Sequence, residues 1–193
     1  MLNVAIIVGT TRPGRKAEDV ARWVHGIAAK RKDASFEVVD IAAFKLPLLD
    51  EPVPPSMGQY SKPHTQAWAA KISVFDAFIF VTPEYNHSIP GSLKNAIDFL
   101  WREWNDKAAG IVSYGGVGGA RAAEQLRLIL GELKVADVRA QVTLSLFTDF
   151  EKFTTFKPAP HQEQAVNAML DDLMAWGQAF KGMRGERGTA AGR

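Results

Sequence analysis

The chain has 193 residues, which fits one ordinary domain with one hydrophobic core. Hydrophobic residues make up 47% of it and charged residues 23%, as in globular proteins, and no apolar run approaches the roughly 20 residues that span a bilayer. There is no cysteine, so disulfides, thiolate metal sites, iron–sulfur clusters and cysteine nucleophiles are excluded. Redox chemistry would therefore need a bound organic cofactor.

The formal net charge of +2 is unevenly distributed along the chain. Residues 181–193 are rich in glycine, carry a net charge of +3 and lack apolar periodicity, which leaves −1 for residues 1–180. We therefore expect one domain over residues 1–180, a flexible basic tail over residues 181–193, and no nucleic-acid partner. The N-terminal stretch MLNVAIIVG has no basic segment and no cleavage site, so we expect a buried strand, a cytoplasmic location and no membrane partner.

Apolar runs typical of buried strands alternate with amphipathic stretches along the chain. Strands are predicted over residues 4–8, 36–41, 77–81, 108–114 and 138–146, and helices over 17–30, 65–74, 93–100, 120–133 and 162–180. Five prolines make residues 46–63 a long loop. The alternation predicts an α/β fold with a doubly wound, five-stranded parallel sheet, and five strands favour the flavodoxin-like order 2-1-3-4-5 over the longer dinucleotide-binding order. In both orders ligands bind at the carboxyl ends of the strands.

The first loop at that edge is GTTRPGRK, residues 9–16, between the first strand and the first helix. Free N–H groups at a helix start attract anions, so we expect a phosphate to bind there. The residues assigned to it are Thr10, Arg12, Arg15 and Lys16. A nucleoside-triphosphate loop is disfavoured because no Gly-Lys-Ser/Thr follows, and the G-x-G-x-x-G turn for a pyrophosphate is absent, so a terminal monophosphate fits better. The alternative is that these charges are only solvated.

The second loop follows the third predicted strand and reads TPEYNHSIPGSLKNAIDFLW, residues 82–101. It resembles the P-E-Y-N-x-S-x-P-G-x-L-K-N-x-I-D signature of the NADPH-dependent FMN reductase family, which includes quinone, azo and chromate reductases. With the Gly-Thr-x-Arg loop and the Ser-Tyr-Gly-Gly segment, the resemblance runs from Gly9 to beyond Gly119. It implies FMN as cofactor and NADPH or NADH as co-substrate.

In that family the P-E-Y-N turn lies against the flavin ring, so the resemblance assigns cofactor contacts to Pro83, Glu84, Tyr85 and Asn86. A planar ring system needs a flat apolar wall and a few in-plane donors, which is consistent with this assignment. The alternative is a proline-kinked loop whose tyrosine packs in the core. His87 is expected to be a surface residue, and Lys94, Asn95 and Asp98 receive no role.

The third loop, SYGGVGGARA, residues 113–122, again joins a strand to a helix and contains four glycines, which let the backbone approach a flat ligand closely. Its family counterpart touches the pyrimidine edge of the flavin, so the resemblance assigns Ser113, Tyr114, Gly115 and Gly116 to the cofactor. The alternative is that the glycines serve only tight packing. Many family members carry serine and asparagine after the first-loop arginine, which leaves the individual phosphate contacts of this chain open.

The resemblance of these loops implies an oxidoreductase that transfers hydride from NAD(P)H through FMN, by ping-pong turnover, to a small electrophilic acceptor: a quinone, an azo compound, a metal ion or free flavin. No catalytic side chain and no bound metal are assigned. The alternative is a flavodoxin-like FMN electron carrier without nicotinamide turnover, although the charge of −1 on residues 1–180 is far from the acidic surface such a carrier would present. A scaffold without cofactor is disfavoured because all three loops are intact.

Four large apolar residues lie close together after the second loop: Phe99, Leu100, Trp101 and Trp104. One helix cannot turn all of them toward the sheet, so at least one aromatic side chain is expected to point outward. Exposed tryptophan is enriched at interfaces, and the resemblance implies association through this helix, so we expect a homodimer or homotetramer. The alternative is that both tryptophans pack beneath the chain's own loops.

Overall fold

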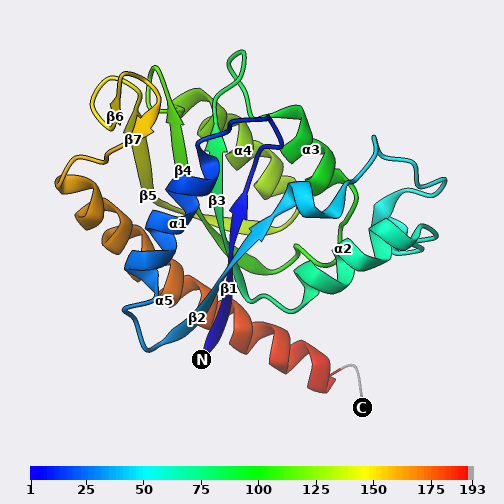
Figure 1. Cartoon of the computed structure of the whole chain (residues 1–193). Coiled ribbons are helices and arrows are strands. Elements are labelled where there is room, and N and C mark those ends of the chain that lie inside the picture. The colour runs from blue at the N-terminus through cyan, green and yellow to red at the C-terminus, as the bar shows by residue number, and fades with distance from the viewer. Residues whose placement is uncertain (191–193) are drawn as a thin grey trace.

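The computed structural model describes the backbone of residues 1–190, and its five main strands form one parallel sheet with the order β2-β1-β3-β4-β5 (Figure 1). The strands are β1 (Leu2–Val8), β2 (Ala34–Asp40), β3 (Ala77–Pro83), β4 (Lys107–Gly115) and β5 (Val135–Ser145). The helices are α1 (Ala17–Ala28), α2 (Pro63–Ser73), α3 (Gly91–Asp98), α4 (Ala120–Glu132) and α5 (His161–Ala190). The predicted flavodoxin-like fold is confirmed.

Short elements occupy the longer connections. Two 3-10 turns, η1 (Ile41–Phe44) and η2 (Pro55–Met57), lie in the proline-rich segment between β2 and α2. A small antiparallel pair, β6 (Phe150–Glu151) and β7 (Thr155–Phe156), follows β5. None of the helices in the described part of the chain is long and apolar enough to cross a membrane.

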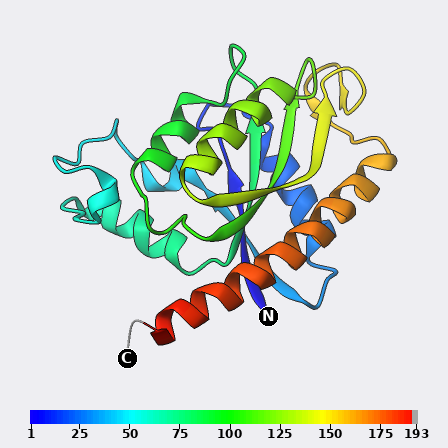
Figure 2. The same ribbon diagram turned by 180° about the vertical axis from the view of Figure 1, so that it is seen from behind.

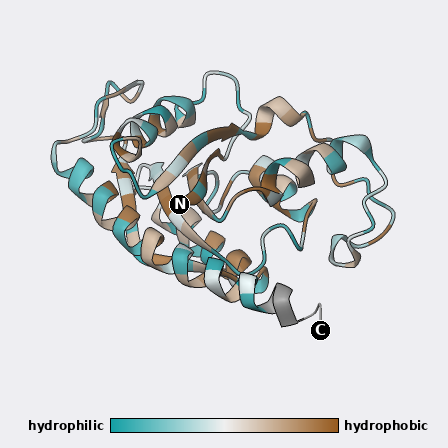
Figure 3. Cartoon of the chain, turned by 90° about the horizontal axis from the view of Figure 1, so that it is seen from below, coloured by the Kyte–Doolittle hydropathy of each residue, from teal (hydrophilic) through white to brown (hydrophobic). Residues whose placement is uncertain are grey.

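The sheet is covered on both faces, which explains the unbroken apolar runs of its central strands. Every residue of β3 and β4 is buried. Helices α1 and α5 pack on one face, and α2, α3 and α4 pack on the other, as Figure 2 shows from behind. In Figure 3 the apolar colouring is concentrated on the strands and on the helix faces turned toward them. Parallel strands buried on both faces have this pattern.

The parallel register brings the three predicted ligand loops to one edge of the sheet. Val8 pairs with Val81, and Pro83 pairs with Tyr114, so the ends of β1, β3 and β4 lie side by side. The loops that follow these strands therefore meet at the carboxyl edge, at the upper side of Figure 1. This is where open α/β sheets bind their ligands.

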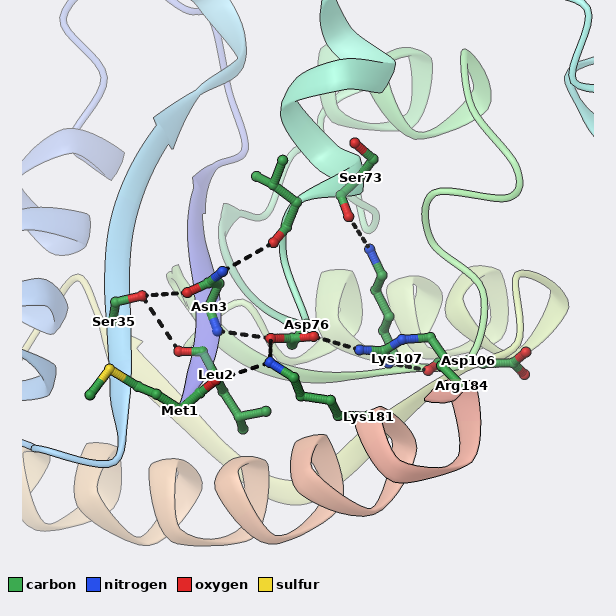
Figure 4. Close-up of polar contacts among 11 residues, drawn as sticks. Met1, Leu2, Asn3, Ser35, Ser73, Asp76, Asp106, Lys107, Lys181 and Arg184 are labelled. Carbon is green, nitrogen blue, oxygen red and sulfur yellow. Dashed lines mark hydrogen bonds and ion pairs between the residues drawn. The ribbon is translucent and has the colours of Figure 1, made fainter. Parts of the chain in front are cut away.

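The C-terminal helix corrects the expectation of a flexible segment from Lys181. Helix α5 continues to Ala190, and the side chains of Lys181 and Arg184 donate to the two carboxylate oxygens of Asp76 at 2.8 and 2.6 Å (Figure 4). Arg184 also donates to the carbonyl of Asp106 at 2.7 Å. Two of the basic residues that suggested a solvated tail, Lys181 and Arg184, instead hold the helix against the amino edge of the sheet. Residues 191–193 of the predicted tail lie outside the described residues.

The aromatic cluster after α3 is mostly buried. Phe99, Leu100 and Trp104 are 0, 1 and 1% exposed, and Trp104 packs edge-on against Trp68 and Phe78. Its indole N–H donates to the carbonyl of Ile97 at 3.1 Å. Trp104 therefore belongs to the chain's own core, because the connection from α3 to β4 folds it under α2. In this cluster only Trp101 remains half-exposed.

Candidate functional site

The loop after β1 begins with a close approach of the backbone to β3. The N–H of Gly9 donates to the carbonyl of Val81 at 2.8 Å. A Cβ atom at Gly9 would lie 2.8 Å from that carbonyl oxygen and 2.9 Å from Leu93 Cδ2. Glycine is therefore needed here for the loop to leave the strand between β3 and α3.

The hydroxyl of Thr10 joins the first loop to the second. Thr10 is 1% exposed, and its Oγ1 lies 3.1 Å from the hydroxyl of Tyr85. The same oxygen accepts a hydrogen bond from the N–H of Arg12 at 3.3 Å, and the guanidinium carbon of Arg12 lies 5.4 Å from the Tyr85 ring centroid. Residues that the sequence places 75 positions apart thus form one contact group at the strand edge.

The first loop keeps unpaired donors for an anion. Within the described residues, the N–H groups of Thr11, Gly14 and Lys16 make no hydrogen bond, and the exposed guanidinium of Arg12 has no carboxylate partner. They precede the first turn of α1, whose N–H groups carry partial positive charge. This donor set fits a terminal phosphate, as the sequence predicts for Thr10, Arg12 and Lys16.

Arg15 has a different position from the one that its assignment implies. Its guanidinium donates to Glu18 at 2.9 Å, to Asp40 at 2.5 Å and to the carbonyl of Thr10 at 3.0 Å, and its side chain is 11% exposed. Two carboxylates thus already neutralise this cation. Arg15 stabilises the conformation of the first loop and connects it to the end of β2. Its contacts favour this structural role over direct binding of the phosphate.

The second loop is a tight hairpin. Tyr85 and Ser88 exchange both backbone hydrogen bonds, at 3.0 and 3.1 Å, around Asn86 and His87, whose φ angles are +48° and +73°. Two central residues with positive φ define a type I′ turn, in which asparagine is favoured. Asn86 and His87 are exposed at the tip, while Tyr85 is half-buried and Pro83 is buried at the end of β3. Asn86 therefore has a conformational role besides its predicted contact with the cofactor.

Glu84 has a buried carboxylate with partners in α4. Its side chain is 5% exposed, accepts a hydrogen bond from the N–H of Arg121 at 3.1 Å and forms an ion pair with the guanidinium of Arg121. Its own N–H donates to the carbonyl of Tyr114 at 3.1 Å. The carboxylate therefore satisfies the start of α4 and joins the second loop to the third. Sequence reasoning missed Arg121, which lies outside the motif.

In the third loop the assigned side chains support the backbone. Ser113 is fully buried, donates to the carbonyl of Gly118 at 2.7 Å and accepts from Gln141 Nε2 at 3.2 Å. Tyr114 packs against Phe150, and burial raises the pKa of its hydroxyl above the usual value. These two side chains are already engaged within the chain.

The backbone of the third loop remains open to a ligand. Gly115 is buried, but Gly116 is exposed, and a Cβ atom there would meet nothing within 4 Å. Gly118 and Gly119 both have a φ of +69°, a conformation that favours glycine. The backbone conformation alone therefore explains why glycine occurs at two of the four positions. Within this loop, Gly116 is the assigned residue best placed to contact a flat ligand from solvent.

Comparison with known proteins identifies the family. The model of the NADPH-dependent FMN reductase family matches residues 2–149, which include all three loops. The chain belongs to this family. The match extends from β1 to the end of the β5 connection, and so covers the whole carboxyl edge of the sheet.

Curated relatives of this NADPH-dependent FMN reductase family member cover most of its length. An NAD(P)H-dependent FMN reductase from Nectria sp is 40% identical over 159 residues, which are 77% of this chain and 79% of the relative. An NAD(P)H-dependent FMN reductase from Schizosaccharomyces pombe is 40% identical, over 76% of this chain and 74% of the relative. The quinone reductase of Escherichia coli is 39% identical, over 67% of this chain and 69% of the relative.

Solved structures confirm the fold. The flavoenzyme NAD(P)H:(acceptor) oxidoreductase FerB from Paracoccus denitrificans superposes with a TM-score of 0.69 at 21% identity, over 90% of this chain and 97% of that protein. An NADH:FMN oxidoreductase in its apo form gives a TM-score of 0.68 at 20% identity, over 90% of each chain. At these identities the likeness is one of fold.

The chemistry available at the edge is binding and orientation. Within the described residues, no group of three or more histidine, aspartate or glutamate side chains is placed to hold a metal ion. Glu84, Arg15 and Arg121 are engaged in ion pairs, and His87 is exposed at the hairpin tip. Free N–H groups, Arg12 and the open backbone at Gly116 remain for a phosphate-bearing planar cofactor.

Proposed function

We propose that the chain is an NAD(P)H-dependent oxidoreductase that binds FMN across the three loops and works by ping-pong turnover. The observation that carries this proposal is the donor set of the first loop. Free N–H groups and Arg12, which pairs with no carboxylate in the described residues, lie just before α1 and beside the P-E-Y-N hairpin. That geometry suits a single terminal phosphate next to a flat ring. Family membership and the names of the curated relatives support the same cofactor and co-substrate.

The residues of the chain would position the cofactor. Arg12 and the N–H groups of Thr11, Gly14 and Lys16 would hold the phosphate, while the Tyr85 hairpin and the backbone at Gly116 would flank the ring. Bound FMN would supply the transfer of hydride and electrons from a reduced nicotinamide to a second substrate. We propose that this substrate is a small electrophile: a quinone, an azo compound, a metal ion or free flavin. The Escherichia coli relative is named a quinone reductase, so quinones are the first acceptors to try.

A spectrum and a reduction experiment test this function. Purified protein should show flavin absorbance, and anaerobic addition of NADPH or NADH should bleach it; adding a quinone should then restore it. Initial rates with both substrates varied should give parallel double-reciprocal lines. A flavin that binds but resists both nucleotides would indicate an electron carrier, and protein that binds no flavin would refute the proposal.

We also propose that two copies of the chain associate through a groove between α3 and α4. The groove has a volume of about 470 Å³ and an apolar wall, in which Leu128 is 72% exposed. The apolar residues that line it are Pro55, Leu100, Trp101, Leu128, Ile129 and Leu133. An exposed apolar surface of this kind is typical of protein interfaces.

A cytoplasmic location stays a prediction, which cell fractionation would test.

A further inference from the structure

We propose that a cavity beside the first loop binds the adenosine end of NADPH, with Lys45 as the partner of its 2′-phosphate; this inference rests on the proposed function. The cavity has a volume of about 560 Å³, within the usual range for small-molecule sites. Its lining residues come from the loop after β1, the segment after β2 and α3. Its lining includes Thr11 of the first loop and four residues at the start of α3 that belong to segment 82–101, but none of the residues that the sequence assigns to FMN.

Hydrogen bonds fix the wall that follows β2. Asp40 accepts from the N–H of Ala42 at 2.9 Å and is itself held by Arg15, so the turn η1 is anchored to the first loop. Lys45 ends this turn with a φ of +47°, a left-handed conformation that a flexible connection would not need. The position of Lys45 is therefore set by the loop that holds the proposed phosphate.

Asn95 of α3 fixes the rest of that wall. Its side-chain amide donates to the carbonyl of Pro47 at 2.7 Å and accepts from the N–H of Leu49 at 3.0 Å. The segment around Leu48 is thus tied to α3 by both polar atoms of one side chain. Both sides of the cavity are held by the chain's own contacts, so the cavity is preformed.

The lining has the composition that a phosphorylated adenosine needs. Ile41, Leu46 and Leu48 supply an apolar wall for a base. Lys45, Thr11 and Ser92 supply donors, and within the described residues these three side chains make no hydrogen bond or ion pair. No carboxylate is among the lining residues.

The charge of this lining distinguishes the two nicotinamide nucleotides. Dinucleotide sites that select NADH use an acidic side chain on the ribose 2′-hydroxyl, whereas those that accept NADPH place a cation near the 2′-phosphate. The cavity has an unpaired cation and no acid. A second cavity near the same edge, about 300 Å³, contains Glu124, and its Arg121 is already paired with Glu84. It is therefore less suited to a phosphate.

Titration with adenosine fragments tests the cavity without any redox step. Calorimetry of the FMN-loaded protein should show that adenosine 2′,5′-bisphosphate binds more tightly than adenosine 5′-diphosphate. Lys45→Gln should weaken binding of the 2′,5′-bisphosphate about tenfold, because it removes a charge-assisted contact to the 2′-phosphate, and should leave the 5′-diphosphate unchanged. Lys45→Arg should retain most of the preference.

Lys134→Gln is the matched control. Lys134 is also exposed, also has a positive φ, +55°, and lies next to the start of β5 at the opposite edge of the sheet.

Steady-state kinetics should show a raised KM for NADPH in Lys45→Gln, with NADH values and FMN retention unchanged.

Three results would overturn the inference: no preference of the wild type for the 2′-phosphate, an equal effect of Lys45→Gln on both nucleotides, or loss of FMN from that variant. The last would assign the cavity to the flavin phosphate. A protein whose flavin neither nucleotide reduces would refute the proposed function separately, since the fragment titration still shows whether the cavity prefers the 2′-phosphate.

Discussion

At the scale of single residues, the contact between the hydroxyls of Thr10 and Tyr85 links the part of the site that would hold phosphate to the part that would flank the ring. Because Thr10 Oγ1 also accepts the N–H of Arg12, the position of that N–H depends on both partners. Tyr85 would thus act on the cofactor through its hydroxyl as well as through its ring. The two roles can be separated by choosing the ligand.

Tyr85→Phe should weaken FMN binding about fivefold, because one neutral hydrogen bond contributes on the order of 1 kcal/mol. Riboflavin, which lacks the phosphate, should bind the variant and the wild type equally. Fluorescence titration of both ligands measures the difference. Equal losses for FMN and riboflavin would show that the tyrosine acts at the ring, and no loss for either would leave the hydroxyl without a role in binding.

The two arginines of the first loop should respond differently to truncation. Arg12 has no carboxylate partner in the described chain, so Arg12→Ala should weaken FMN binding at least tenfold and leave the midpoint of thermal unfolding of the apo protein nearly unchanged. Arg15→Ala removes the cation that pairs with Asp40 and leaves Glu18 with only the more distant Arg22, so it should lower the free energy of unfolding by about 1–2 kcal/mol. FMN titration and urea unfolding of both variants decide the assignment; the reverse pattern would make Arg15 the phosphate ligand.

At the scale of elements, Glu84 joins the second loop to the start of α4. Its carboxylate is 5% exposed and accepts the N–H of Arg121, in the first turn of that helix. Glu84→Gln should lower the free energy of unfolding by about 1–2 kcal/mol, since a nearly buried charge-assisted bond is weakened and the guanidinium loses its partner. Glu124→Gln is the matched control, because Glu124 is 70% exposed in its pair with Arg127 and should change stability by less than about 0.5 kcal/mol. Urea unfolding compares them, and equal effects would contradict the capping role.

The elements themselves could largely be predicted from the sequence. The strands β3 and β4 are buried on both faces, so each reads as one apolar run. The start of β5 was predicted three residues late because Ala136 and Asp137 are half-buried and interrupt the apolar pattern. Helix α5 was predicted to end at Phe180 because Gly182 and Gly185 suggested a break, whereas the ion pairs with Asp76 extend it.

The site could be predicted to the level of loops but not of side-chain partners. The order of the strands places the three loops at one edge whatever their side chains are. Which of two arginines remains free depends on Asp40, 25 residues from Arg15, and the engagement of Ser113 depends on Gln141, 28 residues away. Such pairs follow from register and rotamer, which a single sequence does not display. Asp40, at the end of the neighbouring strand, was the one sign in the sequence that an arginine of the first loop could be paired.

At the scale of the whole molecule, the apolar groove between α3 and α4 predicts self-association. Leu128→Glu places a charge in this groove and should convert a dimer into a monomer at micromolar concentration, without loss of fold, because Leu128 is already 72% exposed. Val74→Glu is the control, since Val74 is 57% exposed at the C-terminal end of α2 and does not line the groove. Light scattering on the two variants and the wild type gives the answer. A monomeric wild type would end the proposal, and dissociation by Val74→Glu would place the interface elsewhere.

The opposite edge of the sheet carries a buried cation whose cost depends on pH. Lys107 is 5% exposed, lies 5.2 Å from the Phe78 ring centroid and donates to the carbonyls of Ile72 and Ser73 at 3.4 Å each. Asp76 offsets its charge only in part, because the same carboxylate pairs with Lys181 and Arg184 (Figure 4). Burial lowers the pKa of Lys107 to about 8 from its usual 10.5.

Stability should therefore rise with pH above about 8. Between the folded pKa of about 8 and the unfolded value of 10.5, the unfolded chain binds more protons than the folded chain, so raising the pH favours folding. Each unit is worth about 1.4 kcal/mol, so the gain between pH 7 and 9.5 is about 2 kcal/mol. The raised pKa values of Tyr60 and Tyr114 act in the opposite direction, but only as pH exceeds the ordinary tyrosine value of about 10.

Lys107→Met should be more stable than the wild type at pH 7, and its stability should no longer rise with pH. Urea unfolding at pH 7, 8, 9 and 9.5 compares the two proteins, and parallel pH curves would show that Lys107 keeps an ordinary pKa in the folded chain.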